Sequence, residues 1–154
     1  MKGIGINRER PDRTNHFFNR AKTAAERSSC LRRMVGAVII NKDGVEISSG
    51  YVGSPRGVED CLLRGVCFRI ELGIKSGQNY ELCRSVHAEQ NAIINAARVG
   101  TSIVGCDMYI YSKKILGTYP SEGEKKDDDC FLQVGIPHFC KIFSPAPVGK
   151  IKLT

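Results

Sequence analysis

The sequence has no tryptophan and no apolar run approaching the roughly 20 residues that a bilayer-spanning helix needs. Residues 1–13 carry charges but lack the apolar centre of a secretory signal, so we expect a flexible leader and a cytoplasmic protein. Of the 154 residues, 42% are hydrophobic and 25% are charged, which is typical of globular proteins. Because repeats and a linker are also lacking, the sequence predicts one domain over residues 14–154.

No single block of the chain holds the basic residues, although the net charge is +7. A basic protein favours anionic partners such as nucleotides, phosphate or nucleic acid. The basic residues are spread along the chain and do not alternate with aromatic residues, as they do in proteins that bind single strands. This distribution favours a small nucleotide as partner and argues against nucleic acid, and nothing indicates a membrane.

Closely spaced cysteine pairs are missing as well, although the chain has seven cysteines. Disulfides are rare in the reducing compartment expected here. Metal ligation, or burial as small apolar side chains, is therefore the expected use of these cysteines.

Two helices are predicted by apolar residues that recur with a period near 3.6, over residues 15–28 and 85–98. Asp12 and Thr14 are candidate N-caps for the first helix, and Ser85 is the candidate for the second. Gly100 is the expected stop signal of the second helix.

A continuous run rich in β-branched residues predicts a buried strand over residues 34–40. The turn Asn41-Lys42-Asp43-Gly44 then predicts a hairpin that returns over residues 45–51. Less regular patterns predict further strands at residues 108–111, 139–143 and 151–153, and a short helix within residues 59–72.

The triplet His87-Ala88-Glu89 stands at the predicted start of the second helix. His-x-Glu followed by Pro-Cys-x-x-Cys is the signature of zinc deaminases. An imidazole and two thiolates hold zinc and leave a fourth position for water, whose pKa the metal lowers. A carboxylate such as that of Glu89 can then move the proton of that water.

The surrounding chain resembles the deoxycytidylate (dCMP) deaminase family over roughly residues 14–111. The matching stretches are Cys30-Leu31-Arg32-Arg33-Met34-Val35-Gly36-Ala37-Val38-Ile39, Gly50-Tyr51-Val52-Gly53-Ser54-Pro55-Arg56-Gly57, Asp60-Cys61 and Leu82-Cys83-Arg84-Ser85-Val86-His87-Ala88-Glu89-Gln90-Asn91-Ala92-Ile93-Ile94. The resemblance implies the α/β cytidine deaminase-like fold, with three α/β/α layers around a mixed sheet. It also implies zinc-dependent hydrolysis of dCMP to dUMP and ammonia, usually in a homo-oligomer.

The sequence departs from the family at two places. Val52 stands where the family usually has an asparagine that holds the substrate, and the Pro-Cys-x-x-Cys motif is missing. Asp127 and Cys130 have the right three-residue step to complete a catalytic zinc site with His87, because aspartate is an acceptable zinc ligand. Two alternatives stay open: His138 with Cys140, or loss of the catalytic metal.

Two further groups of residues follow from the resemblance. Some family members hold a second, structural zinc, which suggests ligands among Cys30, Cys61, Cys67 and Cys83. The family handles a nucleotide phosphate or an allosteric nucleotide in the region of Tyr51, Ser54 and Arg56.

The main hypothesis is therefore a zinc-dependent deaminase acting on dCMP or a close cytosine nucleotide, with Glu89 as the proton shuttle. One alternative is a non-catalytic relative that binds only nucleotide or structural zinc. Another is a deaminase that acts on nucleic acid, which the positive net charge motivates.

Overall fold

The structure is a computed structural model that describes residues 9–75, 78–115, 130–131 and 151–152. Its first element is the helix α1, Arg13–Ala25. Asp12 caps it, since its Oδ1 accepts a hydrogen bond of 2.9 Å from the backbone N–H of Asn15. The helix ends earlier than predicted because the Ser28 hydroxyl already bonds both backbone groups of Val35 in the following strand, at 3.1 and 3.0 Å.

The predicted hairpin and third strand are confirmed and form the centre of the sheet. In the described residues the order is β2-β1-β3-β4, and β5 also pairs with β3. The strands are β1 Arg33–Ile40, β2 Glu46–Tyr51, β3 Asp107–Lys114, β4 Cys130–Phe131 and β5 Ile151–Lys152. All described pairs are antiparallel, so the parallel pairing of a mixed sheet is not among the described residues.

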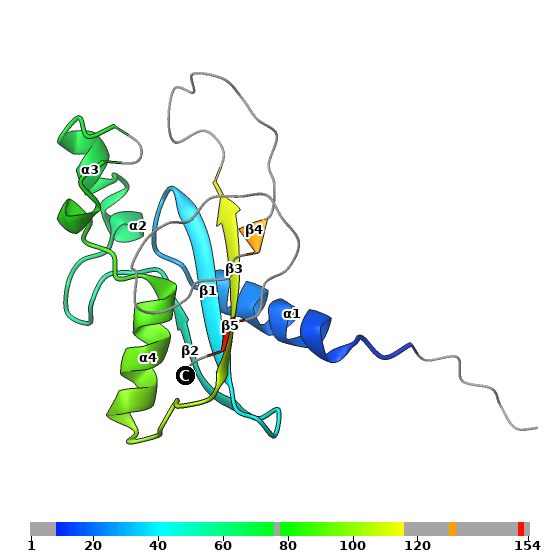
Figure 1. The fold of residues 1–154 in the computed structure, drawn as a ribbon. Coiled ribbons are helices and arrows are strands. Elements are labelled where there is room, and N and C mark those ends of the chain that lie inside the picture. Colours follow the sequence, from blue (N-terminus) through cyan, green and yellow to red (C-terminus); the bar gives the residue numbers. More distant parts are fainter. Residues whose placement is uncertain (1–8, 76–77, 116–129, 132–150, 153–154) are drawn as a thin grey trace, which may run out of the picture.

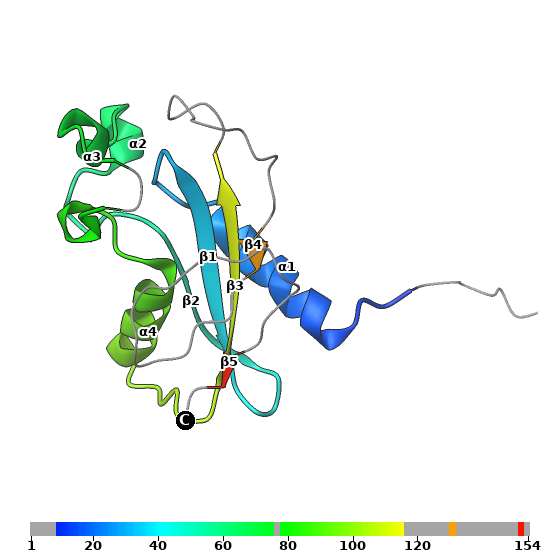
Figure 2. The same ribbon diagram turned by 45° about the horizontal axis from the view of Figure 1, so that its top comes forward.

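Helices cover both faces of the sheet, which confirms the expected α/β/α layering (Figure 1). The second covering helix is α4, Ala88–Arg98, and Figure 2 shows it across the sheet from α1. Strand β1 alternates between the two layers: Ala37 and Ile39 pack with α4, whereas Val38 and Ile40 pack with α1. This alternation is the period-2 pattern of a strand that is buried on both faces.

A glycine permits each helix to approach the sheet closely. A Cβ on Gly36 would lie 2.2 Å from the Ala21 carbonyl oxygen of α1. A Cβ on Gly50 would lie 2.3 Å from the Ala92 backbone nitrogen of α4. Any side chain at either position would therefore collide with helix backbone rather than with a side chain that can move.

The chain between β2 and α4 forms three short helical segments, where the sequence predicted one helix. They are α2 Cys61–Arg64, α3 Phe68–Glu71 and the 3-10 helix η1 Tyr80–Leu82. Arg69 is buried at the centre of this region, donates hydrogen bonds to the carbonyls of Lys75 and Gln78, and lies 4.5 Å from the ring centre of Tyr80. The region is thus organised around a guanidinium rather than around a large apolar core.

The remaining predictions concern the chain after β3, the N-terminal leader and the absence of a membrane-spanning helix. The strand expected near the end is confirmed in part, since Ile151–Lys152 forms β5. The strand expected at residues 139–143 lies outside the described residues, as do residues 1–8 of the expected leader. No helix in the described part of the chain is long and apolar enough to cross a membrane.

Candidate active site at the start of α4

Helix α4 begins one residue after His87, which is its N-cap residue. The prediction that Ser85 caps this helix is wrong. The backbone of the preceding Val86 is extended and pairs with Gly53, so the chain becomes helical only beyond that bridge. The side-chain Oε1 of Gln90 accepts a hydrogen bond of 3.2 Å from the His87 backbone N–H and thereby satisfies one free donor at the helix start.

The bridge between Gly53 and Val86 joins the end of β2 to the start of α4. The Val86 N–H donates to the Gly53 carbonyl at 2.8 Å, and the Gly53 N–H donates to the Val86 carbonyl at 3.2 Å. Antiparallel register then places Val52 opposite His87 and Ser54 opposite Ser85. Two stretches that are distant in the sequence therefore meet directly before the start of α4.

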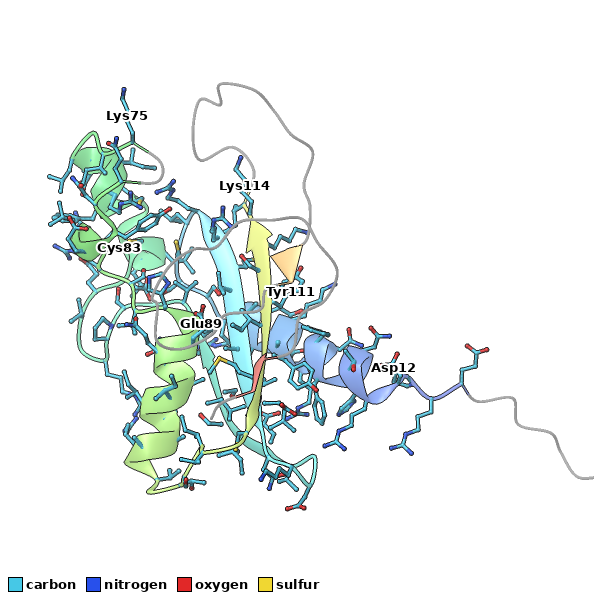
Figure 3. All side chains as sticks on the ribbon, viewed as in Figure 1. Asp12, Lys75, Cys83, Glu89, Tyr111 and Lys114 are labelled. Carbon is cyan, nitrogen blue, oxygen red and sulfur yellow. The ribbon has the colours of Figure 1, made fainter. Side chains whose placement is uncertain are left out.

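Three buried oxygens at this junction have no hydrogen-bond partner among the described residues: Glu89 Oε2, Ser54 Oγ and Ser85 Oγ. Buried polar atoms are almost always paired, and an unpaired one costs about 1–3 kcal/mol. A carboxylate oxygen held in this state, two residues from a half-buried histidine, fits a site that receives a polar ligand. Figure 3 shows Glu89 near the N-terminal end of α4 and Cys83 on the segment that leads into it.

Two asparagines fix α4 against the edge strand β2, and the sequence alone did not single them out. Asn91 Nδ2 donates to the Tyr51 carbonyl at 2.8 Å, and Asn95 Nδ2 donates to the Ser49 carbonyl at 2.9 Å. The buried Ser48 hydroxyl adds a hydrogen bond of 2.6 Å to the Ala92 carbonyl. Amides four residues apart on one helix face were the available signal, because such residues lie one above the other.

Of the other candidates for the catalytic metal site, Cys130 is among the described residues. Cys130 opens β4, where its backbone pairs with Ser112. Asp127, His138 and Cys140 lie outside the described residues. Among the described residues, no three His, Cys, Asp or Glu side chains are grouped so that they could hold a metal ion.

Three of the four cysteines suggested as a structural zinc site interact electrostatically with the fourth, Cys61, which is the first residue of α2. Burial raises the pKa of the Cys61 thiol, a hydrogen bond from the Phe68 backbone lowers it, and the nearby thiols of Cys67, Cys30 and Cys83 raise it further. Cys61 and Cys67 are buried, whereas Cys30 and Cys83 are half-buried. All four are free thiols and three of them lie within electrostatic reach of Cys61, but as placed in the described residues they are not grouped so that they could hold a metal ion.

The predicted nucleotide-binding residues fall into different environments. Ser54 directly follows Gly53 of the bridge to Val86, and its hydroxyl oxygen is buried. Tyr51 ends β2 and is 38% exposed, while Arg56 lies exposed in the turn that follows Pro55. The structure therefore brings Ser54 next to the Gly53–Val86 bridge and leaves Arg56 on the surface.

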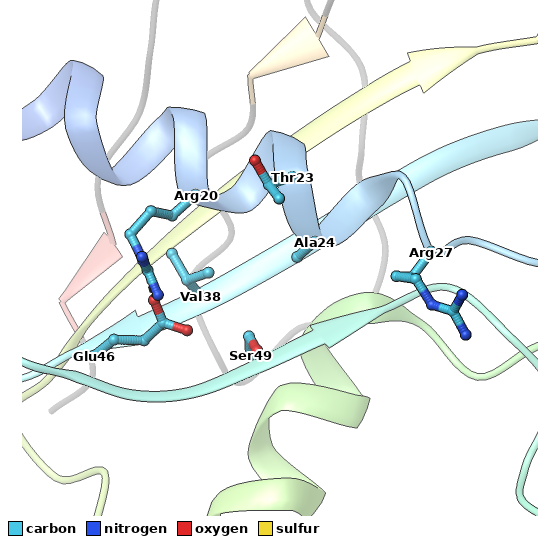
Figure 4. A pocket seen from close by; sticks show the side chains of 7 residues that line it. All are labelled: Arg20, Thr23, Ala24, Arg27, Val38, Glu46 and Ser49. Atoms are coloured by element: carbon cyan, nitrogen blue, oxygen red, sulfur yellow. Dashed lines mark hydrogen bonds and ion pairs between the residues drawn. The ribbon is translucent and has the colours of Figure 1, made fainter.

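A groove of about 310 Å³ lies on the opposite, α1 side of the sheet. Figure 4 shows that Arg20 and Glu46 form an ion pair across it, from α1 to β2. The groove is lined by Arg20, Thr23, Ala24, Arg27, Val38, Glu46 and Ser49. None of the predicted site residues lines it, and its two nearest opposite charges already neutralise each other.

Comparison with known proteins connects this architecture to one family. Residues 11–120 match the family model of the cytidine and deoxycytidylate deaminase zinc-binding region. The chain is 39% identical over 107 residues to the deoxycytidylate deaminase of Schizosaccharomyces pombe, which covers 68% of this chain and 33% of that protein. It is 36% identical over 106 residues to the deoxycytidylate deaminase of Mycobacterium phage D29, which covers 66% of this chain and 78% of that protein.

The fold has a solved counterpart in the dCMP deaminase of cyanophage S-TIM5 in complex with dCMP and dUMP. That structure matches with a TM-score of 0.51 and 26% identity, over 67% of this chain and 67% of that chain. The chain spans only about a third of the length of the yeast relatives, 33% in S. pombe and 27% in Saccharomyces cerevisiae. The match over residues 11–120 includes both covering helices and the His87-x-Glu89 junction, and the chain therefore belongs to the cytidine and deoxycytidylate deaminase family.

Proposed function

We propose that this protein hydrolyses dCMP, or a close cytosine nucleotide, to dUMP and ammonia. The observation that carries the proposal is the buried Glu89 Oε2, which has no partner among the described residues and belongs to the first turn of α4, two residues after His87. Support comes from relatives named deoxycytidylate deaminase and from the solved counterpart with bound dCMP and dUMP.

Glu89 has the role of proton carrier in this reaction. Its carboxylate takes a proton from the attacking water and delivers a proton to the departing amine, so the amino group leaves as ammonia and the water oxygen stays on the base. His87 would hold a zinc ion, with Cys130 and Asp127 as the proposed further ligands. That zinc, when bound, supplies an activated water at neutral pH. Tyr51, Ser54 and Arg56 are the proposed nucleotide-binding residues, and the Ser54 hydroxyl is buried without a hydrogen-bond partner among the described residues.

Ammonia release from dCMP by the zinc-loaded full chain tests the proposal. Glu89→Gln keeps the size of the side chain and removes its basicity, so we expect the rate to fall about 10²- to 10⁴-fold. Equal rates for wild type and Glu89→Gln would refute the role of Glu89. No ammonia from wild type with dCMP, dCTP or cytidine would refute the deaminase function.

A second candidate function is favoured by one observation. Val52 lies opposite His87 and is half-buried, and its side chain can neither donate nor accept a hydrogen bond. A non-catalytic relative that binds only nucleotide or structural zinc would accept such a residue. Calorimetric binding of dCMP without ammonia release would decide for this candidate.

We also propose that Cys30, Cys61, Cys67 and Cys83 hold a structural zinc. The support is the electrostatic interaction of the Cys67, Cys30 and Cys83 thiols with the buried Cys61 thiol. Four thiolates form a closed tetrahedral site, which would order the short helices between β2 and α4. Cys106 offers a matched control, because it is also a buried cysteine whose thiol pKa is raised by burial, but it lies in the core beneath α4.

Zinc stoichiometry tests this site. We expect Cys61→Ser to lower the zinc bound per chain by one and Cys106→Ser to leave it unchanged. Equal zinc contents in the two variants would contradict the structural site.

The proposed setting is the cytoplasm and the proposed assembly a homo-oligomer. The oligomer is supported by exposed large apolar side chains between β2 and α4, among which Leu62 is 60% and Leu63 is 78% exposed. Sedimentation analysis of the full chain tests it, and a monomer at micromolar concentration would refute it.

A further inference from the structure

The start of α4 is held between two non-local contacts, one on each side of His87 and Glu89. Before the helix, Val86 exchanges two backbone hydrogen bonds with Gly53. After the first turn, the Asn91 side chain donates to the Tyr51 carbonyl at 2.8 Å. Tyr51 and Gly53 are two residues apart on the same strand end, so the two contacts close a ring around the His87-Ala88-Glu89 turn.

The chemistry of the partner fixes which end of the Asn91 side chain is used. A backbone carbonyl can only accept hydrogen bonds, so the NH₂ group of Asn91 must face Tyr51. Between the two contacts, α4 lies directly on Gly50, where a Cβ would lie 2.4 Å from the Ala88 carbonyl oxygen. The helix start therefore has an axial position set by Asn91 and a height above the sheet set by Gly50.

We propose that Asn91 is a positioning residue of the site: through Tyr51 it holds the His87–Glu89 turn in register with the Val52–Ser54 strand end. Asn91 neither carries the proton nor binds the metal. It acts because misplacement of a reacting group by about 1 Å can lower a rate about 100-fold. The catalytic part of this inference rests on the proposed deaminase function.

Asn95 provides a matched control one helical turn further along. It makes the same kind of hydrogen bond, Nδ2 to a β2 carbonyl, at 2.9 Å to Ser49. Both bonds lie at the surface, so replacing either asparagine by alanine should affect overall stability little and to a similar extent. Only the Asn91 bond lies beside the His87 turn.

Amide hydrogen exchange of the full chain tests the ring without reference to activity. In Asn91→Ala we expect the Gly53 and Val86 amides to exchange about tenfold faster than in wild type, because their bridge opens more often. In Asn95→Ala we expect both amides to exchange as in wild type. Equal exchange of these amides in the two variants would overturn the proposal.

Steady-state kinetics with dCMP tests the catalytic consequence. In Asn91→Ala we expect kcat to fall about 10- to 100-fold, and KM to change by less than about threefold. Asn95→Ala should retain the wild-type kcat, and equal kcat values for the two variants would contradict the positioning role. If wild type releases no ammonia, the proposed function fails, and the exchange comparison still decides whether Asn91 holds the turn.

Discussion

The two faces of the sheet are built by different means. On the α1 face, large rings fill the interface: Phe17 and Phe18 lie 5.1 and 5.2 Å from Tyr109, measured between ring centroids. On the α4 face, the helix presents the small side chains of Ala88 and Ala92. There, side-chain hydrogen bonds to backbone carbonyls join the helix to β2.

The two faces therefore contribute differently: the α1 face mainly stabilises the fold, and the α4 face mainly positions the residues of the candidate site. The hydrophobic burial of these rings contributes much free energy and is non-directional, so α1 can stabilise the fold without fixing any group to a fraction of an ångström. Hydrogen bonds to backbone carbonyls contribute less energy, but they set distance and register, and they join α4 but not α1 to the carbonyls of β2 in the described residues. The candidate active site lies on the face that is built for position.

The largest expected stability effect is on the α1 face. Phe18→Ala removes a side chain that is only 3% exposed and leaves a cavity against Tyr109. We expect the free energy of unfolding to fall by about 3–5 kcal/mol. Chemical denaturation measures this, and a loss below about 1 kcal/mol would show that α1 is not the stabilising layer.

The next-largest expected effect is on the α4 face, where Gly50→Ala disturbs the contact between helix and sheet. In Gly50→Ala the new methyl group meets the backbone of Ala88 and Ala92, which can yield only if the helix moves outward. We expect a loss of about 1–3 kcal/mol in unfolding free energy, together with a lower kcat for dCMP. Gly57→Ala is not a suitable control, because Gly57 has a positive φ of 81° that strains any other residue. Ala97→Gly on the exposed side of α4 changes a single methyl group without this collision and should leave kcat unchanged.

The smallest expected stability effect is on the α1 face and comes from the loss of an ion pair. The Arg20–Glu46 ion pair spans the groove, but half of the Arg20 side chain is exposed. Exposed pairs contribute about 0–1 kcal/mol, so Arg20→Met should lower the unfolding free energy by less than about 1 kcal/mol at low salt, and by less still at high salt. A larger loss, unaffected by salt, would mean that the packing of the Arg20 stem matters more than its charge.

The sequence predicted the elements that local pattern determines. The β-branched run correctly predicted the central strand, and the Asn-Lys-Asp-Gly turn correctly predicted the hairpin. The period of the apolar residues correctly predicted both covering helices. Gly100 was also correctly predicted as a stop, since its positive φ of 69° ends α4 with hydrogen bonds from Gly100 and Thr101 back to Ala97 and Ala96.

Features set by non-local contacts were not predictable in this way. The N-cap of α4 was misplaced because Val86 is held extended by Gly53, more than thirty positions earlier in the chain. An irregularity in the β1–β2 register next to Ile39 and Ile40 lets both Ile47 and Ser48 contact the α4 layer, which strict alternation would forbid. His87 and Glu89 were found because their motif is local, whereas the partners of His87 depend on which distant segment folds against it.

The most direct test of this account is kcat for dCMP in Phe18→Ala and Glu89→Gln, measured with zinc at a temperature where both variants are folded. We predict that Phe18→Ala retains kcat within about threefold despite its lower stability, whereas Glu89→Gln loses about 10²- to 10⁴-fold while remaining as stable as wild type. The reverse pattern, with activity lost in Phe18→Ala and retained in Glu89→Gln, would contradict the assignment of the active site to the α4 face.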